Sequence, residues 1–122
     1  MRVMKSKRIL VVEDDGTLRG AIVRYLKRLG YDVQGVSNGF EALLLLQYLR
    51  PSLIISDIRM PKLGGLTLVE AIQNREETRG IPLILTSAYP EEKYFNKAKE
   101  LGVKDLLIKP FTLAELHGRI LS

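Results

Sequence analysis

The chain has no cysteine and no tryptophan, and only one histidine among its 122 residues. Without cysteine, disulfide bonds and thiolate metal sites are excluded, and a reducing compartment is the natural default. No apolar run approaches the roughly 20 residues that a membrane-spanning helix needs. The apolar stretch after the basic start is also too short for the core of a signal peptide. We therefore expect a cytoplasmic protein with no membrane partner.

What is present is the mixture of a small globular domain. Hydrophobic residues make up 46% of the sequence and charged residues 27%, which suits one core closed around a single sheet. We expect one domain over residues 1–122. The net charge of +5 could favour an acidic partner or nucleic acid. Because no recognition motif accompanies this charge, we interpret it as solvated surface and expect no direct binding of nucleic acid.

Apolar runs rich in isoleucine, leucine and valine alternate with amphipathic segments of helix length. Strands are predicted over residues 8–12, 31–37, 53–56, 82–87 and 105–109. The second of these mixes polar and apolar residues, which is typical of an edge strand, whereas the first, third and fourth read as strands covered on both faces. The alternation predicts an α/β fold with a doubly wound five-stranded parallel sheet. An edge position for the second strand gives the order 2-1-3-4-5.

Several local signals predict where helices begin. Asn38 with Glu41, and Thr112 with Glu115, have the spacing of a capping box. Pro90 stands ahead of two glutamates, an arrangement that suits the first turn of a helix. These signals place helices after the second, fourth and fifth predicted strands.

The predicted strands deliver reactive side chains to their carboxyl ends, which is where ligands bind in sheets of this kind. The residues at these ends are Glu13, Asp14, Asp15, Asp57, Thr86, Ser87 and Lys109. Facing carboxylates repel one another, so they need protonation or a hard cation with oxygen ligands, for which Mg²⁺ is the best match. A lysine and a hydroxyl on the other side of Asp57 supply donors for an anion. Together these residues predict a phosphoryl site.

Each of these residues also has an ordinary structural interpretation when it is taken alone. Asp15 can simply cap the first helix. Asp14 and Asp57 can be turn residues, Ser87 a hydroxyl at a strand end, and Lys109 a solvated side chain. It is the arrival of all of them at one edge of the sheet that favours a functional site.

The motifs "ILVVEDD", "SDIRMP", "GG", "LTSA" and "KPF" run along essentially the whole chain. In this order and at this spacing the sequence resembles the receiver domain of bacterial two-component response regulators. The resemblance implies a flavodoxin-like receiver fold and a role as a phosphoacceptor in a phosphorelay. It also implies that the protein is not an enzyme beyond its own phosphorylation and dephosphorylation.

By this resemblance, Asp57 is the phosphoacceptor. Its carboxylate would attack the phosphohistidine of a histidine kinase or phosphotransfer protein, or a small phosphodonor, and give an acyl phosphate. Lys109 would pair with one phosphoryl oxygen and Ser87 would hydrogen-bond another. The peptide bond between Lys109 and Pro110 is expected to be cis.

The resemblance also implies that the protein uses Mg²⁺. Asp14 would hold the ion directly and Glu13 through water, with Asp57 and the backbone carbonyl of Arg59 completing the protein ligands. Arg59 and Tyr89 would flank the path of a hydrolytic water. Because both side chains are bulky, we expect slow loss of the phosphoryl group.

Phosphorylation is expected to draw Ser87 toward the new anion and to reshape the face of the fourth helix, fifth strand and fifth helix. The family usually has tyrosine or phenylalanine three residues before Lys109, where this chain has Leu106. We therefore predict a weaker or differently built switch. Gly64 and Gly65 are expected to let the loop after the third strand move and turn without a Cβ penalty.

The resemblance implies a histidine kinase or phosphotransfer protein as partner, docking beside the basic side of the first helix. An output domain or a downstream protein would read the switch. The segment "FEALLLLQYL" contains four consecutive leucines, so some of them must point away from the sheet, which suggests a further interface, such as a homodimer. The chain is expected to be a stand-alone receiver or an excised piece of a longer regulator, and Gly118 in a short last helix favours the second.

Three other functions stay open at this point. A phosphatase with an aspartyl nucleophile generally has a second acid two positions after the nucleophile, where this chain has Arg59. A flavin or nucleotide binder needs a glycine loop after the first strand, where the sequence is the acidic "EDDGTLRG". A receiver that never accepts phosphate is the third alternative, and the complete set of acid, hydroxyl and lysine argues against it.

Overall fold

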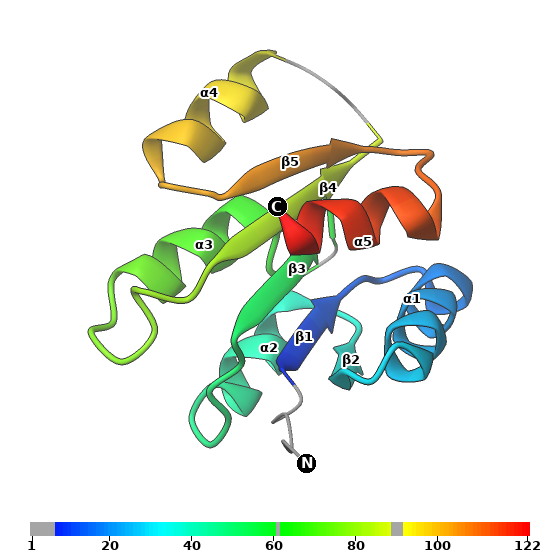
Figure 1. Ribbon diagram of the computed structural model, residues 1–122. Coiled ribbons are helices and arrows are strands. Elements are labelled where there is room, and N and C mark those ends of the chain that lie inside the picture. The colour runs from blue at the N-terminus through cyan, green and yellow to red at the C-terminus, as the bar shows by residue number, and fades with distance from the viewer. Residues whose placement is uncertain (1–6, 61, 89–91) are drawn as a thin grey trace.

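The computed structural model describes residues 7–60, 62–88 and 92–122, without the side chains of 92–95. Within these residues, five strands alternate with five helices (Figure 1). In chain order they are β1 (Arg8–Val12), α1 (Gly16–Arg28), β2 (Asp32–Val36), α2 (Gly39–Leu45), β3 (Leu53–Asp57), α3 (Gly65–Gln73), β4 (Leu83–Ser87), α4 (Glu92–Glu100), β5 (Asp105–Ile108) and α5 (Leu113–Leu121).

The strands form one parallel sheet with the order β2-β1-β3-β4-β5, which confirms the predicted topology. The register places Val12 beside Ser56, Asp57 beside Thr86, and Ser87 beside Ile108. Because neighbouring strands end at nearly the same level, the residues that follow β1, β3, β4 and β5 meet at one edge of the sheet. At this edge two boundaries differ by one residue from prediction: Asp57 still belongs to β3, whereas Lys109 follows β5.

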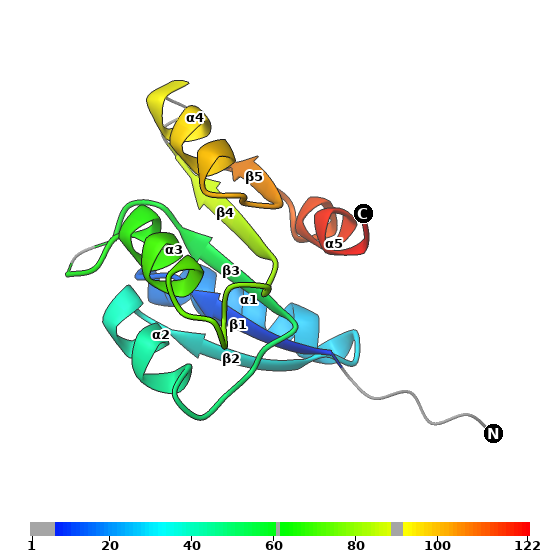
Figure 2. The same cartoon turned by 90° about the vertical axis from the view of Figure 1, so that its left-hand side faces the viewer.

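Helices cover both faces of the sheet, with α1 and α5 on one side and α2, α3 and α4 on the other (Figure 2). Alternate residues of β1 supply the two cores: Leu10 packs toward α2 and α3, and Ile9 packs toward α1 and α5. This alternation follows from the period of two in a strand. Truncating a fully buried residue such as Ile54 to alanine would cost about 2 to 5 kcal/mol.

The predicted edge strand is β2, with three of its five residues exposed, whereas β3 and β4 are buried along their whole length. On α2, the run of four leucines divides as predicted, since Leu44 is exposed and Leu46 is buried. Phe40 and Tyr48 lie one turn before and one turn after Leu44, and both are exposed. An apolar stripe therefore follows the outer side of α2 and the turn after it.

Helix starts use the predicted side chains. Thr112 and Glu115 form a reciprocal capping box at α5. Asn38 accepts from the backbone N–H of Glu41, but the Glu41 carboxylate returns to Ser37 instead of to the Asn38 backbone. The Ser37 hydroxyl donates to that carboxylate, which lowers the pKa of Glu41.

The prediction for Pro90 lies outside the described residues. Among the helices of the described ranges, none combines the length and the apolar character that crossing a bilayer would require.

Candidate functional site

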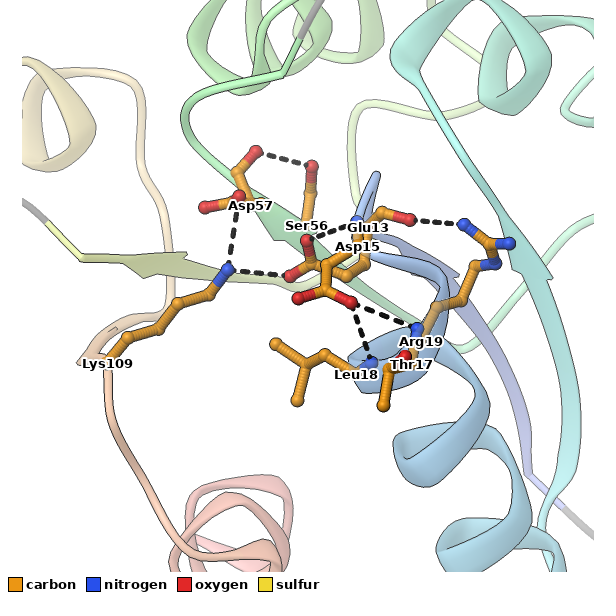
Figure 3. A network of polar contacts seen from close by, with 8 residues as sticks. All are labelled: Glu13, Asp15, Thr17, Leu18, Arg19, Ser56, Asp57 and Lys109. Carbon is orange, nitrogen blue, oxygen red and sulfur yellow. Dashed lines mark hydrogen bonds and ion pairs between the residues drawn. The ribbon is translucent and has the colours of Figure 1, made fainter.

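The acidic edge of the sheet is built around the ammonium group of Lys109. Its Nζ donates to Glu13 Oε1 at 2.8 Å and to Asp57 Oδ2 at 3.2 Å (Figure 3). The three residues come from the carboxyl ends of β1, β3 and β5, so the parallel register brings together positions that are up to 96 residues apart. Lys109 was predicted to lie beside Asp57 and to pair with a phosphoryl oxygen, and here its ammonium bonds the Asp57 carboxylate itself. The shorter bond to Glu13 was not predicted.

Both carboxylates are buried, with Glu13 2% and Asp57 7% exposed. Burial raises the pKa of each carboxyl above its ordinary value, because the charged form loses water, and Lys109 opposes this effect through its hydrogen bonds and charge. Burial also lowers the pKa of Lys109, but bonding to Glu13 and the charge of Asp57 outweigh it and leave the pKa raised. The site therefore holds two desolvated anions around one cation.

Glu13, Asp14 and Asp57 each offer a carboxylate oxygen, and these oxygens lie within 4.8 Å of one another. Asp14 is exposed, whereas the other two acids are buried. Hard oxygen ligands at this spacing, with three negative charges against the single charge of Lys109, fit Mg²⁺. The resemblance implies this ion, and the residues present suit it. The backbone carbonyl of Arg59 stays a predicted ligand.

The turn that carries the acids also begins a helix. The Asp15 carboxylate accepts from the N–H groups of Thr17 and Leu18, which makes Asp15 the N-cap of α1. The backbone N–H of Asp15 donates to the second oxygen of Glu13 at 3.1 Å. The Glu13 side chain is therefore held from two sides, by Asp15 and by Lys109.

The backbone of Asp57 is packed too tightly for any side chain at Gly65. A Cβ atom on Gly65 would lie 2.3 Å from the Asp57 carbonyl oxygen, and the Gly65 N–H donates to the Ile58 carbonyl at 2.8 Å. Close approach to the Asp57 backbone is a reason for glycine at position 65 that was not predicted, and the movement of this loop stays a prediction. The residue with positive φ in the described part of the loop is Lys62, at 70°.

Ser56 is a contact that sequence reasoning missed. Its fully buried hydroxyl donates to the Asp57 carbonyl at 3.0 Å. A serine within an apolar strand, directly before the acid, was the available signal. The bond supports the same carbonyl that Gly65 packs against, so the backbone of the acid is fixed from two directions.

The opposite wall of the site is formed by β4 and the residues after β5. Ser87 is 1% exposed, and its carbonyl accepts from the Lys109 N–H at 2.8 Å. The peptide bond between Lys109 and Pro110 is cis, as predicted. Beside it lies a cavity of about 510 Å³, which Ala88, Lys109 and Pro110 line together with Asp15, Leu18 and Phe111. The cavity therefore lies beside Lys109, at the acidic edge of the sheet.

Leu106 and His117 lie on β5 and α5, away from the acidic edge. Leu106 is half-buried in β5 and lines a groove of about 310 Å³ with Ala98 and Val103. Tyr89 lies outside the described residues, so its predicted role stays a prediction. His117 belongs to α5, and its Nε2 is 3.1 Å from the hydroxyl of Tyr31.

A family model described as the response regulator receiver domain matches residues 9–121. The chain is 36% identical, over 94% of its length, to the alkaline phosphatase synthesis transcriptional regulatory protein PhoP of Bacillus subtilis, and covers 47% of that protein. It is also 36% identical, over 93% of its length, to the sensor histidine kinase TmoS of Ectopseudomonas mendocina, but covers only 12% of it.

Among solved structures, a response regulator receiver protein from Pseudomonas putida is 32% identical, with a TM-score of 0.90 and 98% of both chains covered. The chain spans about half the length of the first curated relatives that it matches. The fold, the order of the strands and the family match agree with one another. The chain therefore belongs to the response regulator receiver family and is a receiver domain of two-component signal transduction.

Proposed function

We propose that Asp57 is the residue of this receiver domain that accepts the phosphoryl group, and that the chain forms one receiver unit over residues 1–122. The observation that carries the proposal is the placement of one lysine between two buried carboxylates, with a third acid within 4.8 Å. A site that only stabilised the fold would gain little from burying these charges, because desolvation opposes them. Acceptance of a phosphoryl group gives the arrangement a purpose.

In the proposed step, an Oδ of Asp57 attacks the phosphorus of a phosphohistidine and an O–P bond forms. The P–N bond breaks, and its electron pair returns to the imidazole of the donor. Mg²⁺, when bound by Glu13, Asp14, Asp57 and the Arg59 carbonyl, supplies positive charge to the phosphoryl oxygens. Positioning and charge neutralisation do most of the work in such transfers, and little covalent chemistry is left to the protein.

Lys109 has two proposed tasks. Before transfer, it bridges Asp57 and Glu13 by bonding to both carboxylates, and its charge offsets their mutual repulsion. After transfer, its ammonium pairs with an oxygen of the phosphoryl group on Asp57, while the Ser87 hydroxyl at the end of β4 bonds another. The hydrogen bond from the Lys109 backbone N–H to the Ser87 carbonyl keeps these two donors on the same side of Asp57.

The switch would act through α4, β5 and α5, with Ser87 moving toward the new anion. Leu106 in β5 stands where the family usually has an aromatic ring, so we propose a weaker or differently built switch. A structure with a phosphate mimic that shows little movement around Ser87 and Leu106 supports this proposal. A large rearrangement of both residues contradicts it.

The proposed partners are a histidine kinase or phosphotransfer protein as donor, and an output domain or downstream protein as receiver of the signal. Relatives of about twice the length are regulators, and one relative is a sensor histidine kinase. We propose a cytoplasmic site of action and no catalytic turnover beyond phosphorylation and dephosphorylation of the domain. The exposed stripe of Phe40, Leu44 and Tyr48 supports a further protein contact, such as a homodimer.

The test is phosphoryl uptake from a small acyl phosphate in the presence of Mg²⁺, followed by intact mass. Wild type should gain the mass of one phosphoryl group, and Asp57→Asn should gain none. Asp32→Asn is the matched control, because Asp32 is an exposed aspartate paired with Arg8 away from the site. Equal uptake by wild type and Asp57→Asn would overturn the proposal. A phosphatase with an aspartyl nucleophile is less well supported, because Arg59 stands where such enzymes place their second acid.

A further inference from the structure

Arg19 reaches back from the first turns of α1 to the end of β1. Its Nη1 donates to the backbone carbonyl of Glu13 at 2.8 Å (Figure 3). The N–H of the same Glu13 donates to the Val36 carbonyl of β2 at 3.0 Å. Both backbone polar groups of this buried acid are therefore bonded, one by the neighbouring strand and one by the Arg19 side chain.

The edge strand makes room for the stem of Arg19. A Cβ atom on Gly35 would lie 3.1 Å from Arg19 Cγ and 3.3 Å from its Cδ, which is tighter than ordinary van der Waals contact. The missing side chain at this position of β2 thus lets the methylene groups lie flat against the strand. Because the stem is packed there, the guanidinium has a defined approach to the Glu13 carbonyl.

These contacts fix the acidic turn at both of its ends. At one end, Asp15 caps α1 through the N–H groups of its first turn. At the other, Arg19 holds the carbonyl of Glu13. Asp14 lies between the two fixed points, and its exposed carboxylate is one of the three that approach within 4.8 Å.

We propose that Arg19 is a positioning residue for the acidic turn, and that its bond to the Glu13 carbonyl sets the affinity of the site for a divalent cation. Arg19 acts through the backbone and does not touch the cation itself. The inference rests on the proposed function of the site, and it extends that function to a residue outside the set of acid, hydroxyl and lysine. Groups that orient metal ligands typically change affinity when they are replaced.

The direction of the change in Mg²⁺ affinity on replacing Arg19 distinguishes a positioning role from an electrostatic one. The positive charge of Arg19 opposes cation binding, so removing the charge alone would tighten binding. Loss of positioning would weaken binding, because Asp14 and Glu13 would spend less time in the geometry that the ion needs. The two explanations therefore predict opposite changes for one variant.

The experiment is calorimetric titration of the full chain with Mg²⁺, at a temperature well below unfolding. Arg19→Met removes the donor and the charge but keeps an apolar stem over Gly35, and we expect about tenfold weaker binding. Arg24→Met is the control, because Arg24 is an exposed arginine on the same helix, and its affinity should be unchanged or slightly higher. Affinity in Arg19→Met equal to that of Arg24→Met, or tighter than wild type, overturns the proposal.

Two further variants test whether a change in Mg²⁺ affinity comes from positioning or only from lower stability. Arg19→Lys keeps the charge and one donor, and should recover part of the lost affinity. Gly35→Ala keeps Arg19 but crowds its stem together with Val23 Cγ2, and should weaken Mg²⁺ binding with no change in charge. If Arg19→Met and Gly35→Ala lower only the melting temperature and leave the affinity unchanged, the proposal is wrong.

Phosphoryl uptake by wild type is measured separately. A wild type that takes up no phosphoryl group contradicts the proposed function. The inference on Arg19 is decided by the Mg²⁺ affinities alone.

Discussion

Both ends of the parallel sheet carry ion pairs, but the pair at the amino end is exposed and the pair at the carboxyl end is largely buried. At the amino end, Arg8 and Asp32 pair at 3.2 Å with side chains that are 47% and 54% exposed. At the carboxyl end, Lys109 pairs with Glu13 at 2.8 Å with side chains that are 19% and 3% exposed. Exposed pairs contribute little to stability and are easily replaced. The buried cluster is costly to assemble, so its presence indicates a use other than stability.

Replacing the basic residue of each ion pair is expected to give the largest difference in stability between the two ends of the sheet. Without Mg²⁺, Lys109→Met should lower the free energy of unfolding by about 2 to 3 kcal/mol, because it leaves two buried carboxylates without their partner. Arg8→Met should cost less than about 1 kcal/mol. Denaturant unfolding in chelator measures both. Equal losses at the two ends would contradict the comparison, and added Mg²⁺ should recover more stability in Lys109→Met than in Arg8→Met.

A second contrast uses two glycines. Gly65→Ala places a Cβ atom 2.3 Å from the Asp57 carbonyl oxygen, and should cost about 1 to 3 kcal/mol and slow phosphoryl uptake. Gly118 lies inside α5, and a Cβ atom added there would meet no atom within 4 Å. Gly118→Ala should therefore stabilise by about 0.5 to 1 kcal/mol. Tolerance of alanine at Gly65, with normal stability and uptake, would show that the loop is not packed as described.

The burial of Asp57 should also make the stability of the protein depend on pH. Burial raises the pKa of Asp57 above its ordinary value of 3.8, so the folded protein binds this proton more tightly than the unfolded chain. The contribution of Asp57 to the stability of wild type should then fall as pH rises from the ordinary value through the raised one. Asp57→Asn has no charge to desolvate, so its advantage in chelator should grow across this range and then stay constant. An advantage that does not change with pH would contradict the burial argument.

The smallest effect is expected at the rim of the site. Arg59 is exposed two residues after Asp57, and Arg59→Ala should speed loss of the phosphoryl group a few-fold by opening a path for water. Tyr89→Ala is expected to act in the same direction. The decay of phosphorylated protein, followed by mass after the donor is removed, measures the rates. Arg28→Ala, at an exposed arginine of α1, is the control, and decay rates equal to it would remove the idea.

The fold was predictable because its signals are local. Strand periodicity located all five strands to within one residue at each end, and the polar edge strand β2 fixed the order. The differences lie at element ends, where β3 includes Asp57 and β5 ends before Lys109.

The sequence predicted which residues gather at the edge of the sheet, but not how they contact one another. Strand ends identified Asp57 and Lys109, because parallel strands present their carboxyl ends at one edge. The bond from Lys109 to Glu13 depends on the reach of a side chain across 96 residues of sequence. The packing of Gly65 against Asp57 and the bond of Arg19 to Glu13 depend on backbone approach in three dimensions. Residue types and spacing carry no direct signal of such contacts.

The central claim is that the buried carboxylate of Asp57, held by Lys109, receives the phosphoryl group. The most direct test is to phosphorylate wild type, reduce the acyl phosphate with borohydride and locate the resulting homoserine by peptide sequencing in a mass spectrometer. The account predicts homoserine at position 57 and an unchanged aspartate at positions 14 and 15. Homoserine at another aspartate, with position 57 intact, would contradict it.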